Sequence, residues 1–225
     1  MFIIDTKYYN DSYIENIKKR TKYNAEGQQD LDIYWDKDFA RILDTWGVDS
    51  TWLEVQLLLA NCNGKVLDIA CGSGPVLQLC MGFKNINLYG CDISDLLLKK
   101  AHEERGIPKE KLVLNDATKM SYYDDEFNFS YSIGSLEHFT EEGIAKFISE
   151  SYRVTKFGSF HLVPTNEKGE DEGWISPLQS YYNNSIEWWL VHFKKSYETV
   201  IFVKSKWQDP GRSYGHWFLC YKNLP

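Results

Sequence analysis

A short strand pattern that carries an acid and continues into a glycine turn constrains this chain more than any other feature. Residues 66–77 read Val-Leu-Asp-Ile-Ala-Cys-Gly-Ser-Gly-Pro-Val-Leu. Without side chains at Gly72 and Gly74, the backbone can turn tightly and let a ligand approach the amide groups that begin the next helix. The segment therefore predicts a strand, a ligand-binding turn and a helix.

Alternating strand and helix patterns continue as far as residue 165. Five short apolar runs are separated by helical patterns, and they cover residues 65–70, 87–92, 111–115, 127–133 and 157–163. This alternation predicts a parallel sheet with helices on both faces. Ser94 can cap the helix after the second run, and a helix beginning at residue 140 or 141 and ending near 154 follows the fourth.

The first quarter of the chain has a different pattern. Residues 1–62 are rich in aromatic side chains and predict helices. The clearest helix is expected at 49–60, where Leu53, Leu57 and Leu58 recur at helical spacing. We expect this region to form a helical lid or flank.

The last third also departs from the alternation. Residues 166–195 combine a loop rich in Gly, Glu, Ser and Pro with a helical pattern at 185–194, and we expect them to form a lid insertion. Strand patterns at 200–207 and 216–221 are joined by turn residues, which predicts an antiparallel hairpin at the sheet edge. Residues 196–225 are therefore expected to form a C-terminal hairpin.

Together these patterns predict one α/β domain with a mostly parallel, seven-stranded sheet. Its cofactor-binding core is expected at 63–165, because the strand-helix alternation is confined to that range. The remaining segments are expected to cover the core or extend its sheet.

Composition excludes several classes of function. The 225 residues carry a formal net charge of −7, whereas nucleic-acid binders usually cluster Lys and Arg on one surface. The N-terminal residues lack the basic segment of a secretory signal, and no run of about 18 apolar residues is present. We expect a cytoplasmic protein that contacts neither nucleic acid nor a membrane.

Cysteine spacing gives no sign of a metal or of a disulfide framework. The five cysteines are an odd number without Cys-x-x-Cys spacing, at positions 62, 71, 80, 91 and 220. No His, Cys and Asp residues stand at metal-ligand spacing, so no metal is expected.

Acidic residues close to the ends of three predicted strands are candidates for ligand binding. Asp92 could accept both hydroxyl protons of a ribose, or it could only cap the following helix. Asp116 could receive the amino group of an adenine, or it could only form a loop turn. Leu77 stands where a dinucleotide-binding turn needs a third glycine, and Asp68 would repel a pyrophosphate. A cationic or neutral cofactor is the better match.

In order and spacing, these residues resemble the class I S-adenosylmethionine-dependent methyltransferase family. The resemblance covers about residues 64–164. It is carried by Asp68-x-Ala70-x-Gly72-x-Gly74, by Asp92, by Asn115-Asp116-Ala117, and by Ser-Ile-Gly-Ser-Leu-Glu-His-Phe at 132–139. Ala70 departs from the pattern, since many members have glycine there.

The resemblance implies a Rossmann-like fold that binds S-adenosylmethionine and releases S-adenosylhomocysteine. In the family, the glycine turn contacts the methionine part of the cofactor, the acid of the second strand binds ribose and the acid after the third approaches adenine. The cofactor contacts implied here are Asp68, Ala70, Cys71, Gly72, Gly74, Asp92, Ile93, Asp116, Ala117 and Ser132.

Catalytic and substrate residues are expected near the end of the fourth strand and in the lid. His138 is the leading candidate for a general base, because imidazole titrates near physiological pH, and Glu137 is its alternative or its orienting partner. The same two residues could instead be architectural, and an anionic acceptor would need no base. The expected substrate contacts are Tyr34, Trp35, Asn166, Trp174 and Tyr181, each of which could also be a packing residue.

The function expected from the sequence is methyl transfer to oxygen or nitrogen of a small molecule, for example a bacterial sugar or a surface-polysaccharide precursor. Two alternatives stay open: a nicotinamide-dependent oxidoreductase, and a catalytically inactive partner protein that binds the cofactor. The sequence leaves open whether the protein is a monomer or a homodimer.

Overall fold

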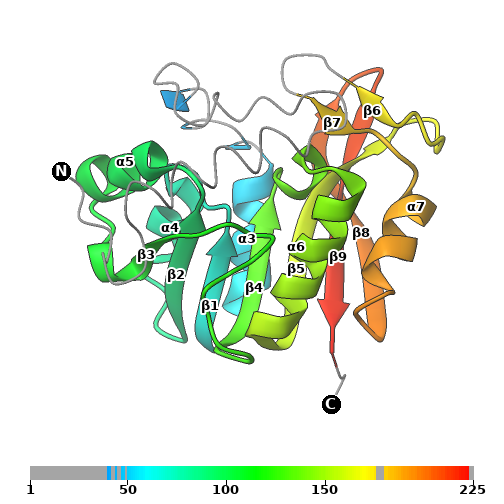
Figure 1. Cartoon of the computed structure of the whole chain (residues 1–225). Helices are drawn as coiled ribbons and strands as arrows, with labels where there is room; N and C mark the ends of the chain where they lie inside the picture. Colours follow the sequence, from blue (N-terminus) through cyan, green and yellow to red (C-terminus); the bar gives the residue numbers. More distant parts are fainter. Residues whose placement is uncertain (1–39, 42–43, 45–46, 49, 176–179, 223–225) are drawn as a thin grey trace.

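Seven strands form one mixed sheet that is mostly parallel. The computed structural model describes residues 40–41, 44, 47–48, 50–175 and 180–222. The strand order is β3-β2-β1-β4-β5-β9-β8 (Figure 1). The strands are β1 (Gly64–Ile69), β2 (Ile86–Asp92), β3 (Leu112–Leu114), β4 (Phe127–Ile133), β5 (Thr155–Asn166), β8 (Thr199–Asp209) and β9 (Ser213–Tyr221).

The first five strands run parallel, and β9 pairs antiparallel with both β5 and β8. The predicted sheet and its hairpin at one edge are therefore confirmed. The second half of β1 and most of β5 are buried, as expected for strands that helices cover on both faces.

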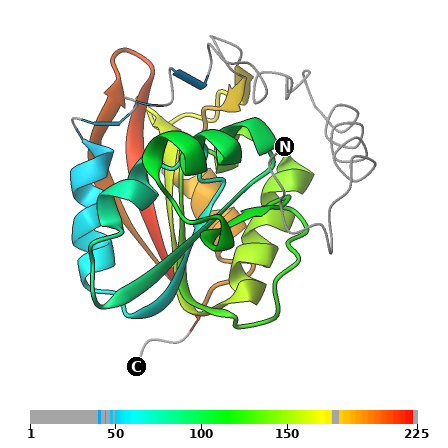
Figure 2. The ribbon, with the colours of Figure 1, turned by 90° about the vertical axis from the view of Figure 1, so that its left-hand side faces the viewer.

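Helices cover both faces of the sheet. One face is covered by α3 (Thr51–Ala60), α4 (Pro75–Cys80) and α5 (Asp95–Arg105), and the other by α6 (Glu141–Val154) and α7 (Ile186–Phe193). The turned view in Figure 2 separates α3, in cyan, from α6, in light green, on opposite sides of the sheet. Two short 3-10 helices are also present: η2 (Lys109–Lys111) lies just before β3, and the buried η3 (Leu136–His138) follows β4.

The alternation of side chains along β1 explains the two separate cores. Val66 packs in the cluster under α3 and α4, whereas Leu67 and Ile69 pack in the cluster under α6 and α7. Since successive side chains of a strand point to opposite faces, one apolar run supplies both cores.

The strand order reverses direction between β1 and β4. From β1 the chain moves outward through β2 to β3, and it then returns to β4 on the other side of β1. In open α/β sheets, ligands bind outside the carboxyl ends of the strands at this switch point. The glycine turn follows β1, and η3 follows β4, so both lie at this edge of the sheet.

The helix expected at 49–60 is present as α3, but the leucine spacing that indicated it does not mark its buried face. Leu53 and Leu57 are 54% and 63% exposed, while Val55 and Leu59 are fully buried. This helix has apolar residues on several sides, so spacing alone does not select the buried face. Packing of α3 against the C-terminal hairpin determines which face is buried. In this contact, Glu54 of α3 accepts a hydrogen bond from Trp217 Nε1 of β9 at 2.8 Å.

The lid insertion contains more regular structure than the sequence predicts. Within the expected loop, β6 (Trp174–Ile175) and β7 (Tyr181–Tyr182) form a separate antiparallel pair. β5 also continues three residues beyond its predicted end, so Asn166 is its last residue. Within the described part of the chain, no helix is long and apolar enough to cross a membrane.

Candidate functional site

The turn after β1 uses left-handed backbone at three positions. The φ angles are +60° at Ala70, +56° at Gly72 and +76° at Gly74. A Cβ atom at Gly74 would lie 2.5 Å from Ile107 Cδ1 and 3.1 Å from the Cβ of Ala101. Gly74 is therefore required both by its conformation and by close packing, whereas Ala70 holds a conformation that costs an ordinary residue about 1–2 kcal/mol.

Asp92 connects this turn to the start of α5. Its Oδ2 accepts a hydrogen bond from Gly72 N at 2.8 Å, and its Oδ1 accepts one from Ser94 N at 2.9 Å. Burial raises the pKa of Asp92 to about 6, even though both amide groups favour the charged form. Because a carboxylate has about four acceptor positions, these two bonds leave capacity for hydroxyl donors.

Asp68 is buried on the same face of the sheet. Its Oδ2 accepts a hydrogen bond from the hydroxyl of Tyr131 at 2.8 Å. Burial raises the pKa of Asp68 well above its usual range, and the negative charge of Asp92 raises it further. Sequence reasoning missed Tyr131, although a tyrosine in a buried central strand needs a partner for its hydroxyl.

The two acids form a site suited to a cation. Within the described residues, no ion pair involves Asp68 or Asp92. Two neighbouring buried carboxyl groups are costly to ionise without a positive partner, and a cationic ligand would offset that cost. The same pair would repel a pyrophosphate.

Residues after β3 are engaged in a turn. Asp116 Oδ1 accepts hydrogen bonds from the amide and the hydroxyl of Thr118, both at 2.7 Å. Ala117 is buried in the core under α6, and Ile93 is partly exposed after β2. The Oδ1 atom of Asp116 thus forms a loop turn, as one of the two interpretations expects. The contact of Asp116 with adenine stays a prediction.

The side chain of Ser132 contacts the neighbouring strand β5. Its hydroxyl is 2.9 Å from His161 Nδ1, and both residues are fully buried. Phe147 and Phe193 pack around the His161 ring on the α6 and α7 face. The expected cofactor contact of Ser132 stays a prediction.

Glu137 and His138 lie together in η3, directly after β4. His138 Nδ1 donates to the backbone oxygen of Ser180 at 2.7 Å, and its Nε2 is 3.9 Å from Glu137 Oε1. Burial lowers the pKa of His138 to about 4 and raises the pKa of Glu137 to about 8. The Oε2 atom of Glu137 is buried and has no hydrogen-bond partner among the residues that the structure describes. At neutral pH the pair therefore holds a neutral imidazole beside a mostly protonated carboxyl group.

The structure brings one of the expected substrate residues close to this pair. The ring of Tyr181 meets that of His138 edge-on, with centroids 6.3 Å apart. Trp174 packs edge-on against Tyr182, and in the described part of the chain its buried Nε1 atom has no hydrogen-bond partner. Asn166 is engaged within the insertion, since its Oδ1 accepts a hydrogen bond from Lys168 N at 2.8 Å.

Tyr34 and Trp35, also expected to contact substrate, lie outside the described residues.

An ionic cluster around Asp44, which no sequence pattern predicts, contacts the glycine turn. Asp44 accepts hydrogen bonds from Lys100 Nζ at 2.7 Å, from Arg105 at 2.8 Å and from the hydroxyl of Ser73 at 3.1 Å. Burial opposes ionisation of Asp44, but the bonds to Lys100 and Arg105 hold its pKa below the usual value. The partners are distant in sequence, so no local pattern could identify the cluster.

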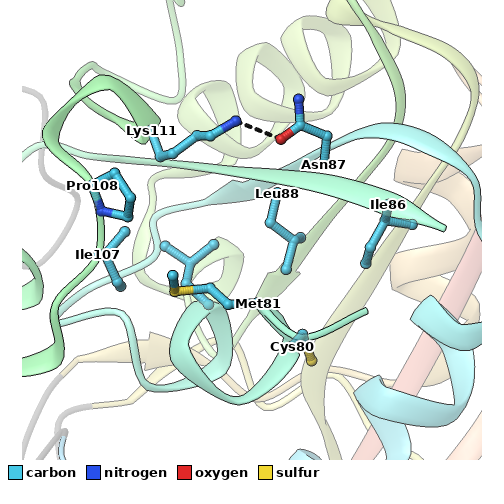
Figure 3. Close-up of a pocket in the computed structure, with 9 residues that line it drawn as sticks. Cys80, Met81, Ile86, Asn87, Leu88, Ile107, Pro108 and Lys111 are labelled. Carbon is cyan, nitrogen blue, oxygen red and sulfur yellow. Dashed lines mark hydrogen bonds between the residues drawn. The ribbon is translucent and has the colours of Figure 1, made fainter. Parts of the chain in front are cut away.

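A small cavity lies elsewhere, between α4 and the first half of β2 (Figure 3). Its walls are mostly apolar, with Lys111 Nζ and Asn87 Oδ1 hydrogen-bonded at one side. Its volume is about 110 Å³, which is below the roughly 300–1,000 Å³ of typical ligand sites. It is also remote from the carboxyl ends of the strands, so we do not assign the cofactor to it.

The fold and the acid-lined glycine turn are similar to those of Rossmann-like, class I S-adenosylmethionine-dependent methyltransferases. Residues 66–158 match a family described as "Methyltransferase domain". The chain therefore carries a methyltransferase domain, whose cofactor is S-adenosylmethionine. No curated protein matches the chain.

Three solved structures of similar fold are distant from this chain in sequence. A protein of Pyrococcus horikoshii is 21% identical, with a TM-score of 0.60, and the match covers 82% of this chain and 99% of that chain. A methyltransferase of Methanosarcina mazei is 17% identical, with a TM-score of 0.60 and coverage of 72% and 93%. The [4+2]-cyclase SpnF is 20% identical, with a TM-score of 0.57 and coverage of 68% of this chain and 60% of that chain. The fold thus also occurs in a protein named for another reaction.

Proposed function

We propose that this protein transfers the methyl group of S-adenosylmethionine to oxygen or nitrogen of a small molecule. The observation that carries the proposal is the pair of buried acids, Asp68 and Asp92, beside a left-handed glycine turn at the switch point of the sheet. That combination suits a ligand with positive charge and ribose hydroxyls, and it disfavours a nicotinamide dinucleotide.

Each element of the turn would make a separate contribution to binding. Asp92 would accept the ribose hydroxyls, and Asp68 would balance the ammonium group of the methionine part. Gly72 and Gly74 would let that part approach the backbone at the start of α4. The cofactor supplies an electrophilic methyl group on a sulfonium, and the protein's contribution is to align an acceptor lone pair behind it.

The acceptor would lie near η3. Glu137 and His138 follow β4 at the same edge of the sheet, and Tyr181 stands beside His138. Glu137 Oε2 and Trp174 Nε1 have no partner within the described residues, so each could hydrogen-bond to a bound polar molecule. A hydroxylated or amine-containing metabolite, for example a sugar or a polysaccharide precursor, fits these groups and the net charge of −7.

We also propose a reducing compartment such as the cytoplasm. All five cysteines are free and buried, and free thiols are typical of such compartments.

Calorimetric titration tests the cofactor assignment. Purified protein is titrated with S-adenosylmethionine, S-adenosylhomocysteine and NADH, together with the Asp92→Ala variant. We expect binding of the first two ligands and at least a tenfold loss in the variant. Asp124→Ala is the matched control, because this exposed acid precedes β4 at the opposite edge of the sheet. Binding of NADH alone would instead favour an oxidoreductase.

A second experiment separates an active enzyme from an inactive partner protein. The protein is incubated with methyl-labelled cofactor and a panel of sugars, sugar nucleotides and amines, and labelled products are separated by mass. Labelled product that disappears in Asp92→Ala would support methyl transfer. Tight cofactor binding without product across the panel would favour a binding protein.

A further inference from the structure

A backbone carbonyl group fixes which nitrogen of His138 carries hydrogen. His138 Nδ1 lies 2.7 Å from the backbone oxygen of Ser180. A carbonyl oxygen can only accept a hydrogen bond, so Nδ1 is the protonated nitrogen of the neutral ring. Burial lowers the pKa of His138 to about 4, so the ring is neutral at physiological pH. Its Nε2 atom therefore carries a lone pair and no hydrogen.

The lone pair of His138 Nε2 is available to a bound molecule. Within the described residues Nε2 forms no hydrogen bond, because Glu137 Oε1, at 3.9 Å, is too distant for one. The side chain of His138 keeps 10% exposure. Because η3 directly follows β4, this nitrogen lies at the edge of the sheet that also carries the glycine turn. A substrate bound beside that turn would meet a hydrogen-bond acceptor here.

The segment that contains Ser180 is connected to the C-terminal hairpin by a directed chain of hydrogen bonds. Ser180 directly precedes β7, where the hydroxyl of Tyr181 is 3.2 Å from Ser213 Oγ at the start of β9. Ser213 Oγ donates in turn to Asn183 Oδ1 at 2.9 Å. Because a hydroxyl has a single hydrogen, Tyr181 is the donor to Ser213. In Figure 1, β6 and β7 lie at the upper end of the hairpin.

Asn183 also connects this chain of hydrogen bonds to the insertion. Its Nδ2 donates to Glu172 Oε2 at 2.7 Å and to the backbone oxygen of Arg212 at 3.3 Å. Asn183 and Ser213 are fully buried, and a satisfied, buried network of hydrogen bonds holds its members in one arrangement. The network therefore fixes β7, and with it the carbonyl group that bonds to His138.

Building on the function proposed above, we propose that Ser213 and Asn183 are positioning residues that hold His138 Nε2 as a hydrogen-bond acceptor for the group that is methylated. A group that donates to Nε2 must carry hydrogen. The methylated group is then a hydroxyl, or an amine that retains an N–H bond. A carboxylate or phosphate oxygen would instead face the lone pair of Nε2, and this repulsion selects against it.

Nitrogen NMR tests the state of His138 without any methylated substrate. The ring nitrogens of the five histidines are observed in isotope-labelled protein at pH 7, and His138→Gln assigns the signals of His138. We expect Nδ1 of His138 to be protonated and Nε2 to show the chemical shift of a nitrogen without hydrogen. His102 is an internal reference, because its Nδ1 lies 2.8 Å from the backbone oxygen of Ile107.

Exchanging polar partners tests the network. Asn183→Asp places a carboxylate against that of Glu172, so β7 should shift and the Nε2–H form of His138 should rise to about a fifth or more of the population. Adding Glu172→Gln restores one donor and one acceptor with their roles exchanged, so the double variant should return to the wild-type signals. Glu170→Gln, the same change at an exposed residue of this loop, should leave the His138 signals unchanged.

Kinetics with a substrate from the labelled panel give a second readout. Asn183→Asp and Ser213→Ala should each lower kcat/KM for that substrate about tenfold, while the dissociation constant of S-adenosylhomocysteine changes less than about twofold. The double variant with Glu172→Gln should recover most of the loss. A purely structural role would instead lower Tm and leave kcat/KM of the folded protein unchanged.

A wild-type His138 that is protonated at Nε2 would overturn the proposal, as would a tautomer that is the same in every variant. Preferred methylation of a carboxylate or phosphate oxygen would overturn the assigned substrate class. Failure of the wild-type chain to bind S-adenosylmethionine would contradict the proposed function instead, whichever nitrogen of His138 carries hydrogen, so the two failures are distinguishable.

Discussion

Asp92 forms one set of hydrogen bonds within the protein and is proposed to form another with the cofactor, and both require its ionised carboxylate. It holds the turn through Gly72, and in the proposed site it accepts the ribose hydroxyls. Both tasks use lone pairs of the ionised carboxylate. Burial places the pKa of this group at about 6, so protonation falls within an accessible pH range.

Cofactor affinity is therefore expected to depend on pH. Because the ligand prefers ionised Asp92, affinity should be full above about pH 7 and fall as pH drops through about 6. Titration of S-adenosylhomocysteine between pH 5 and 8 measures the effect. Asp92→Asn should bind more weakly at pH 7.5 and lose most of the slope. An equal slope in this variant would assign the titration to another group, with Asp68 the first to examine.

Glu137 should destabilise the protein as pH rises. Its folded pKa is about 8, above its ordinary value of 4.5, so the folded state retains a proton that the unfolded chain releases. Stability from this group is full below about pH 4.5 and is lost as pH rises through 8. Between pH 5 and 8 we expect Glu137→Gln to gain stability relative to wild type, on the order of 1–3 kcal/mol. Urea unfolding of both proteins at pH 5 and at pH 8 measures this difference in the free energy of unfolding.

The control for this prediction is Glu142→Gln, the same change on the exposed face of α6, which should follow the wild-type pH dependence. The measurement also bears on catalysis. A rate limb near pH 8 that is absent in Glu137→Gln would identify Glu137 as the base, whereas a limb near pH 4 would point to His138.

At the scale of elements, Asp44 joins three parts of the cofactor region. It contacts Ser73 in the glycine turn and two basic residues of α5, and one of these, Arg105, also bonds to Gln78 of α4 at 3.0 Å. The side chains of Lys100 and Arg105 are largely buried. The cluster therefore positions the turn relative to the two helices that flank it.

Removing the charge of Asp44 should weaken cofactor binding indirectly, because Asp44 positions the glycine turn and is not itself proposed to contact the cofactor. We expect Asp44→Asn to raise the dissociation constant of S-adenosylhomocysteine about three- to tenfold. Wild-type affinity should fall between 0.1 and 1 M salt, and the variant should respond less, because salt screens partly exposed ion pairs. Glu104→Gln is the control, since Glu104 also pairs with Lys100, at 3.3 Å, but does not reach the turn. Equal effects of the two changes would argue against a positioning role.

For the whole molecule, the cofactor should stabilise the fold by mass action. At about 100 times its dissociation constant, a ligand that binds only the folded state adds roughly 2.7 kcal/mol. For a chain of this size that corresponds to an increase in Tm of roughly 5–10 °C. Thermal melts with S-adenosylhomocysteine test this, and NADH at the same concentration should leave Tm unchanged.

The architecture could be predicted because its signals are local. Apolar runs, caps such as Ser94 and Thr140, and glycines with left-handed φ are each readable within a few residues. The face of α3 could not be predicted, because a helix with apolar residues on several sides takes its orientation from the hairpin, about 150 residues later in the chain. The same limit applies to the bond from Tyr131 to Asp68 and to the Asp44 cluster.

Burial of all five thiols makes them reporters of conformational opening. Burial raises the pKa of Cys62 and Cys80 to about 12, and that of Cys71 well above its usual range. An alkylating reagent reacts with the thiolate, so labelling of the closed molecule should be very slow. Cys71 lies in the glycine turn and Cys220 in the hairpin. Mass spectrometry of the modified peptides would therefore time the opening of the turn separately from unfolding of the sheet, in the unmodified wild-type chain.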